Sequence, residues 1–273
     1  MPTLAIDDRR LSYEDYGSGR VVVLIHGSPG NAKAWARVGE RLAARYRVIA
    51  PDLPGYGEST PQPPGREPDV GYAGELVEAL IRRVGPPAAL AGHSYGGVVA
   101  LAVALRGHVP VGALALFEPV ALKVLAMAGE SEAYATAKSV FDDYISSFEG
   151  GDDRAVRKMV DFWFGDGAFG KMPEPVTSFL IRQTAANIRD VRAAFRESYS
   201  VSALRGLQMP VLTVVGDRSP ETTHLIARVI AERAPHGSAT RLATATHALT
   251  TTHVDAVADA ISSVANDAER FSR

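Results

Sequence analysis

One short segment, Gly92-His93-Ser94-Tyr95-Gly96-Gly97, constrains the fold of this chain more than any other. An apolar run at 88–91 precedes it, and a second apolar run follows it. The pattern predicts a strand that turns sharply into a helix, with Ser94 at the corner in a strained conformation with φ > 0. Gly92 and Gly96 have no Cβ atom, so the strand and the helix can approach each other closely. The turn would hold the Ser94 hydroxyl above a helix N-terminus, whose dipole favours developing negative charge.

Strand-like and helix-like segments alternate along most of the chain. Two short strands, at 4–6 and 10–16, indicate an N-terminal hairpin. Further apolar runs of strand length lie at 21–25, 46–50, 88–91, 111–117, 211–215 and 239–243. Segments with helical spacing lie between or after them, at 32–45, 69–84, 221–234 and 252–267. This alternation predicts an α/β fold with a mostly parallel sheet that is covered by helices on both faces.

Residues 119–205 break the alternation. They contain helical patterns at 134–148 and 155–164 and no clear strand. We therefore predict that 119–205 form a helical cap inserted between two strands, and that 1–118 and 206–273 form the α/β core. A length of 273 residues is enough for one large domain with such an insertion.

Composition excludes several classes of function. The formal net charge is −2 without any basic run, so nothing indicates a nucleic-acid partner. The absence of cysteine excludes disulfides, thiolate metal sites and a cysteine nucleophile. The histidines lack the spacing of a zinc site, so we expect neither a metal nor a cofactor.

The chain shows no sign of membrane association. No apolar run approaches the roughly 20 residues that span a bilayer. Residues 1–16 are polar and lack the apolar stretch of a signal peptide. We expect a cytoplasmic protein that acts on a small molecule, and the sequence does not indicate its oligomeric state.

His247 is the candidate general base. A serine hydroxyl is a poor nucleophile until a base takes its proton and a third group orients that base. His247 follows the predicted strand 239–243 through a turn of small residues and precedes the last helix. This order would place it at the C-terminal edge of the sheet, where ligands bind in open α/β folds.

Four motifs in chain order make this sequence resemble the α/β-hydrolase fold superfamily. Residues 26–30 resemble its oxyanion-hole loop, 52–59 its Asp-x-x-Gly-x-Gly-x-Ser loop, 92–97 its nucleophile elbow, and His247 its late histidine. The resemblance covers nearly the whole chain and implies a cofactor-free serine hydrolase. It also implies that the backbone N–H groups of Ser28 and Tyr95 form an oxyanion hole.

Other polar residues in these motifs are expected to be structural. We expect His26 to support the oxyanion loop and His93 to shape the elbow. Asp52 and Ser59 are expected to hold their own loop together.

Two carboxylates compete for the third position of the triad. Many relatives carry Gly-x-x-Asp after the penultimate strand, but this chain has Ser219 in that slot and Asp217 two residues earlier. Glu118 directly follows the apolar strand 111–117, a position from which some α/β-hydrolases, including haloalkane dehalogenases, take their acid. We prefer Glu118 over Asp217, and either chain order is compatible with the fold.

The predicted function is hydrolysis of a carboxylic ester or lactone through an acyl-enzyme on Ser94. Trp35, Phe117 and Trp163 are the candidate residues that contact substrate. Two alternatives stay open, a C–C bond hydrolase of a dienoate or β-diketone and a non-catalytic ligand-binding protein. Dehalogenases and epoxide hydrolases are disfavoured because their nucleophile is an aspartate at the elbow.

Overall fold

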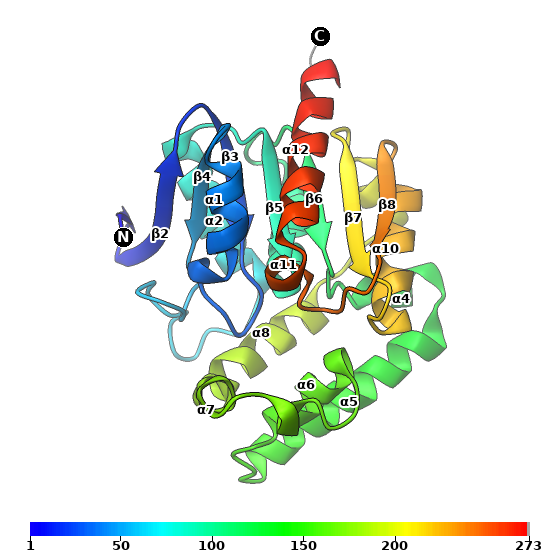
Figure 1. Ribbon diagram of the computed structural model, residues 1–273. Coiled ribbons are helices and arrows are strands. Elements are labelled where there is room, and N and C mark those ends of the chain that lie inside the picture. The colour runs from blue at the N-terminus through cyan, green and yellow to red at the C-terminus, as the bar shows by residue number, and fades with distance from the viewer. Residues whose placement is uncertain (272–273) are drawn as a thin grey trace.

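A single eight-stranded sheet forms the centre of the molecule. The computed structural model describes residues 1–271 (Figure 1). The order across the sheet is β1-β2-β4-β3-β5-β6-β7-β8. β2 pairs antiparallel with β1 and β4, and all other neighbours are parallel. The strands are β1 (Thr3–Ile6), β2 (Arg9–Gly17), β3 (Arg20–Ile25), β4 (Tyr46–Pro51), β5 (Ala89–His93), β6 (Leu114–Phe117), β7 (Val211–Gly216) and β8 (Gly237–Leu242).

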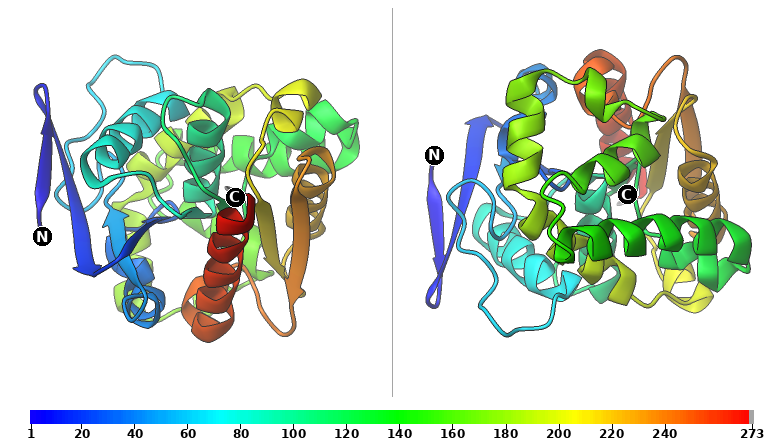
Figure 2. Two further views of the ribbon diagram at one scale, coloured as in Figure 1. Left: turned by 90° about the horizontal axis from the view of Figure 1, so that it is seen from above. Right: turned by 90° about the horizontal axis from the view of Figure 1, so that it is seen from below.

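Helices cover both faces of the sheet, as an α/β fold requires (Figures 1 and 2). On one face, α1 (Ala36–Leu42) packs against α12 (Val254–Phe271), near the short elements η1 (Ala32–Trp35) and α11 (Leu249–Thr252). The other face carries α2 (Val70–Val84), α3 (Tyr95–Arg106) and α10 (Glu221–Arg233). Within residues 1–271, no helix has both the length and the apolarity to cross a membrane.

β3 illustrates why the central strands are apolar along their whole length. Successive side chains of a strand point to opposite faces. Val22 and Leu24 join the core cluster under α1 and α12, whereas Val23 and Ile25 join the cluster under α2 and α3. All four side chains are fully buried, because helices cover both faces of the sheet.

The predicted elements agree with the structure apart from their boundaries. The N-terminal hairpin is confirmed as β1 and β2. The strand predicted at 111–117 begins only at Leu114, because the N–H of Gly112 donates to the carbonyl of Pro87 in a connecting turn. The helix predicted at 252–267 begins at Val254, and the separate short helix α11 precedes it.

All segments with regular structure between β6 and β7 are helical. The helices of this region are α4 (Lys123–Ala128), α5 (Ser131–Glu149), α6 (Val156–Phe164), η2 (Phe169–Lys171), α7 (Glu174–Arg182), α8 (Thr184–Arg196) and α9 (Val201–Arg205). Helices α5, α6, α7 and α8 lie beyond the carboxyl ends of the parallel strands, at the bottom of Figure 1. The division into a core of 1–118 and 206–273 and a cap of 119–205 stays a prediction, and residues 272–273 lie outside the described part of the chain.

The turn between β5 and α3 has the predicted strain. Ser94 adopts φ 53° and ψ −122°, which confirms the expected positive φ. A Cβ atom on Gly92 would lie 2.2 Å from the carbonyl oxygen of Gly96, and one on Gly96 would lie 2.3 Å from that of Ile25. Only glycine fits at either position, so these two residues fix the close approach of β3, β5 and α3.

The substitution Gly96→Ala tests this close approach. Its methyl group would meet two backbone carbonyls, of Ile25 and His26, which cannot move aside as a flexible side chain would. We expect a loss of about 2–3 kcal/mol or more in the free energy of unfolding, measured by urea denaturation. Gly170→Ala is the control, because a Cβ there meets no atom within 4 Å. Equal stability of the two variants would contradict the packing described here.

Candidate active site

Three side chains from distant parts of the chain form a hydrogen-bonded row at the carboxyl end of the sheet. The Oγ atom of Ser94 lies 3.0 Å from Nε2 of His247, and Nδ1 of His247 lies 3.1 Å from Oε2 of Glu118. Ser94 is 7% exposed, His247 5% and Glu118 0%. Because Glu118 can only accept a hydrogen bond when ionised, the proton of His247 lies on Nδ1, and Nε2 is free to accept from Ser94.

Glu118 sits at a second strained position of the backbone. It follows β6 with φ 50°, and its N–H donates to the carbonyl of Val214 at 2.9 Å. Its Oε1 atom accepts from the N–H of Gly216 at 2.5 Å and from the hydroxyl of Ser219 at 2.7 Å. Burial raises the pKa of Glu118, but the bonds from His247, Gly216 and Ser219 outweigh it, so the net pKa lies below its usual value.

The structure brings Glu118, and not Asp217, to the histidine. Asp217 is exposed, and its N–H donates to the carbonyl of Leu242. Ser219, in the slot where many relatives carry the acid, donates its hydroxyl to Glu118 instead. The last residue of β7 and the loop after it therefore contribute hydrogen-bond donors to a carboxylate that directly follows β6.

His93 is hydrogen-bonded to the backbone of the loop that carries His247. Its Nε2 atom lies 2.8 Å from the carbonyl oxygen of His247. A carbonyl can only accept, so Nε2 carries the proton. Burial lowers the pKa of His93 to about 3, which keeps the ring neutral at physiological pH. The expectation that His93 is structural agrees with these contacts.

The loop after β3 lies directly beside Ser94. A Cβ atom on Gly27 would stand 3.0 Å from the Cβ of Ser94. His26 is fully buried, and burial lowers its pKa to about 4. Its Nε2 accepts from the N–H of Leu53 at 2.8 Å, so Nδ1 donates to the carbonyl of Gly27 at 2.7 Å. His26 thus ties the loop to the segment after β4, as expected for a structural residue.

Asp52 anchors the same region from that segment. Its Oδ1 accepts from the N–H of Ala32 at 2.8 Å, and its Oδ2 accepts from the hydroxyl of Ser12 at 2.7 Å. The hydroxyl of Ser59 donates to the carbonyl of Asp52 at 2.7 Å. Asp52 and Ser59 therefore hold the loop together, as the sequence predicts.

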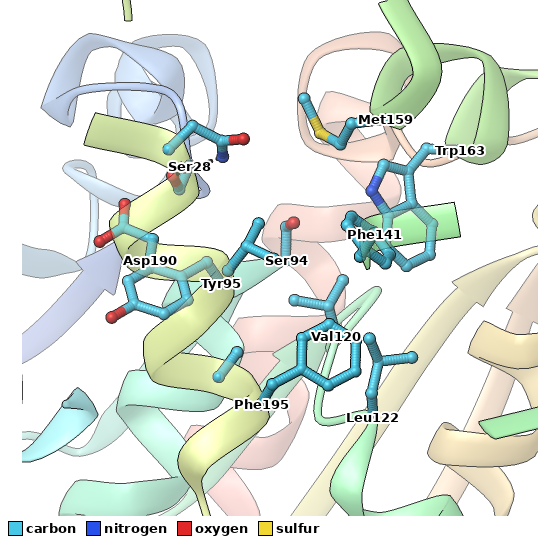
Figure 3. Close-up of a pocket in the computed structure, with 13 residues that line it drawn as sticks. Ser28, Ser94, Tyr95, Val120, Leu122, Phe141, Met159, Trp163, Asp190 and Phe195 are labelled. Atoms are coloured by element: carbon cyan, nitrogen blue, oxygen red, sulfur yellow. Dashed lines mark hydrogen bonds between the residues drawn. The ribbon is translucent and has the colours of Figure 1, made fainter. Parts of the chain in front are cut away.

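A mainly apolar pocket opens above Ser94 (Figure 3). It contains about 360 Å³ of space between atoms, including the part that is open to solvent. Ser28 and Tyr95, the predicted oxyanion-hole residues, line it together with Ser94. The other lining residues are Val120, Leu122, Phe141, Met159, Trp163, Asn187, Asp190, Val191, Ala194 and Phe195.

Trp163 lies on this pocket, whereas Trp35 and Phe117 do not. The indole of Trp163 stacks on the imidazole of His247, with 4.7 Å between ring centroids and 11° between planes. Trp35 and Phe117 pack edge to face, 5.9 Å apart, in the core cluster under α1 and α12. Their assignment as substrate contacts is therefore wrong, because their side chains fill the core between the sheet and the helices α1 and α12 and do not line the pocket.

Two polar residues that were not expected from the sequence, Asn187 and Asp190, also line the pocket. Both come from α8, where a spacing of three places them on one helix face with Val191 and Ala194. No sequence motif surrounds these two residues. The one feature that could have indicated them is the presence of two polar residues, three apart, on an otherwise apolar helix face. Burial raises the pKa of Asp190 to about 7.

The part of the chain that the structure describes contains no metal-binding cluster. No group of three or more His, Asp or Glu side chains within residues 1–271 is arranged to hold a metal ion.

The fold, the elbow and the hydrogen-bonded row define a hydrolase of the α/β type. A family model described as the alpha/beta hydrolase family matches residues 22–260, and the chain belongs to this family. The chain is 27% identical over 243 residues to the (E)-2-((N-methylformamido)methylene)succinate hydrolase of Acinetobacter baylyi, and the match covers 87% of each. Other curated relatives match over shorter stretches, and the chain spans only 36% and 32% of two of them.

Solved structures share the fold. A thermophilic esterase from Thermogutta terrifontis superposes with a TM-score of 0.71 at 24% identity, over 97% of each chain. The enol-lactonase from Burkholderia xenovorans superposes with a TM-score of 0.67 at 18% identity, over 97% of this chain and all of the other. At these identities the likeness concerns the fold alone.

The substitution Ser219→Ala tests how the carboxylate of Glu118 is held. The variant loses one hydrogen bond to an ionised group, and we expect a loss of about 1.5–3 kcal/mol of stability at neutral pH. The lost bond favours the ionised carboxylate, so the difference is full above the ordinary glutamate pKa and disappears as pH falls through the lowered pKa of Glu118. Chemical denaturation across this pH range measures it. Ser198→Ala, at an exposed position, is the control, and a pH-independent difference would contradict the assignment.

Proposed function

We propose that this protein hydrolyses carboxylic esters or lactones through an acyl-enzyme on Ser94. The observation that carries the proposal is the buried row Ser94–His247–Glu118 at the floor of an apolar pocket. A serine in this arrangement attacks a carbonyl carbon while the imidazole takes its proton.

In the proposed acylation step, Nε2 of His247 removes the proton of Ser94 as the Oγ–carbon bond forms. Glu118 keeps the proton of the ring on Nδ1 and stabilises the imidazolium that results. The imidazolium then gives its new proton to the leaving alcohol oxygen as the ester C–O bond breaks. In deacylation, His247 activates a water molecule in the same way, and the acid and free Ser94 are released.

The negative oxygen of the tetrahedral intermediate needs donors that are already in place. We assign this role to the backbone N–H groups of Tyr95 and Ser28. Tyr95 is the first residue of α3, and the first N–H groups of a helix have no partner within it. By analogy with donor deletions, each such bond is worth roughly 3–4 kcal/mol in the transition state.

An apolar pocket supports an ester or lactone as the substrate class. Aromatic and aliphatic side chains from α5, α6 and α8 surround the site, so hydrocarbon next to the carbonyl can be buried. The hydrolase of Acinetobacter baylyi and the structurally similar esterase and enol-lactonase are in line with this class.

Covalent labelling tests the nucleophile. We expect a fluorophosphonate probe to modify the wild-type protein at Ser94 and not to modify Ser94→Ala, as read by mass spectrometry of the intact protein and its peptides. The wild-type protein should also hydrolyse short p-nitrophenyl esters. If the wild type is neither labelled nor active on esters, lactones and vinylogous diketones, catalysis by Ser94 is excluded. Activity confined to the diketones would instead favour a C–C bond hydrolase.

Paired substitutions test the acid. Glu118→Gln removes the charge that stabilises the imidazolium, and we expect kcat to fall by a factor on the order of 10³–10⁴. Asp217→Asn is the matched control, and because Asp217 is exposed we expect kcat to change less than about twofold. Circular dichroism and thermal melting establish that both variants fold. The reverse ranking of the two variants would move the role to Asp217.

A further inference from the structure

The polar side chains of Ser28, Asn187 and Asp190 line the pocket, in contrast to its mainly apolar wall. Together with Tyr56, which contacts Ser28 and Asp190, they form what we call the polar cluster. Nδ2 of Asn187 donates to the hydroxyl of Ser28 at 2.9 Å. The same Ser28 hydroxyl lies 2.8 Å from the hydroxyl of Tyr56. The hydroxyl of Tyr56 donates to Oδ2 of Asp190 at 2.6 Å. The cluster joins α8 to the loops that follow β3 and β4.

Asp190 shares the pocket with Ser94 and is used by no step of the proposed reaction. Figure 3 shows Asp190 and Tyr95 on one side of Ser94, with Trp163 and Phe141 on the other. A bound ester that reaches Ser94 therefore has a carboxyl group on one side and aromatic rings on the other.

The carboxyl of Asp190 has capacity to accept a further hydrogen bond. Its Oδ2 accepts from the hydroxyl of Tyr56, and an ionised carboxylate has about four lone-pair sites. Arg189, the preceding residue in the chain, lines an adjacent cavity together with Asp190 and Asp69. Burial raises the pKa of Asp190 to about 7. The hydroxyls of Ser28 and Tyr56 and the charge of Arg189 favour the ionised form, but burial outweighs them.

We propose that Asp190 binds a hydrogen-bond donor, a hydroxyl or an ammonium group, carried by the substrate whose reacting carbonyl lies at Ser94. The proposal rests on the proposed function and narrows its substrate class to esters or lactones that bear such a group. The donor bonds to a lone pair of the Asp190 carboxylate, while the hydrocarbon part contacts Trp163, Phe141 and Phe195.

Binding to the Ser94→Ala variant tests this without turnover. The ligands are short esters with a hydroxyl or an ammonium group at the end of the acyl or of the alcohol chain, each paired with the ester in which methyl replaces that group. Isothermal titration calorimetry gives the Kd of each pair. We expect the donor-bearing member of at least one pair to bind about tenfold more tightly or better. Equal binding within all pairs, or no binding by any ligand, would overturn the proposal.

Second substitutions in the same background assign the preference to Asp190. Asp190→Leu should abolish it, because leucine cannot accept a hydrogen bond. Asp190→Asn should keep the preference for a hydroxyl and lose that for an ammonium group, which separates the two donors. Tyr56→Phe, which removes a neighbour but leaves the carboxyl, should keep both. A preference that persists in Asp190→Leu, with thermal melting showing a folded protein, contradicts the role of Asp190.

These outcomes are independent of ester hydrolysis. Ser94→Ala lacks the nucleophile, so its binding preference is measured even if the wild type cleaves no ester. Failure of the proposed function appears in the labelling experiment alone. Failure of the Asp190 proposal appears in the binding experiment alone.

Discussion

The buried carboxylate of Glu118 is the interaction on which the rest of the site depends. It receives hydrogen bonds from Gly216 at the end of β7 and Ser219 in the following loop, and it faces His247 in the loop after β8. A buried charge is costly unless its lone pairs are used, and here three groups from two segments use them. The same contacts join the loop that carries His247 to the ends of β6 and β7. Glu118 therefore stabilises the fold at the point where it orients the imidazole.

The sequence allowed the fold and the row of polar groups to be predicted because both follow from local patterns. Apolar runs alternate with helical spacing, and the elbow between β5 and α3 needs glycine at two defined positions. Glu118 was preferred because a carboxylate at the end of an apolar strand is unusual, and the structure brings it to His247. The hydrogen bond from Ser219 to Glu118 was not predictable, because it depends on how the loop after β7 folds back toward β6.

The substrate side of the pocket was predicted less well, for a physical reason. Trp35 and Phe117 are large apolar residues near motif residues, but strand alternation and the position of α1 bury them under the sheet. Asp190 and Asn187 reach the pocket only through the placement of α8 relative to the core. That placement depends on packing between helices far apart in sequence, which residue spacing does not encode. Trp163 of α6 was expected at the pocket, but the polar residues of α8 become visible there only in three dimensions.

The stack of Trp163 on His247 has a consequence for observing this protein in solution. The chain has two tryptophans, and Trp35 lies in the core at 1% exposure, away from the pocket. Trp163 belongs to α6 and covers the imidazole. Since an imidazole stacked on an indole affects its emission, the intrinsic fluorescence of this protein carries a signal from His247, the proposed general base. Any displacement of α6 by an entering ligand would change that emission while the signal of Trp35 stays constant as an internal reference.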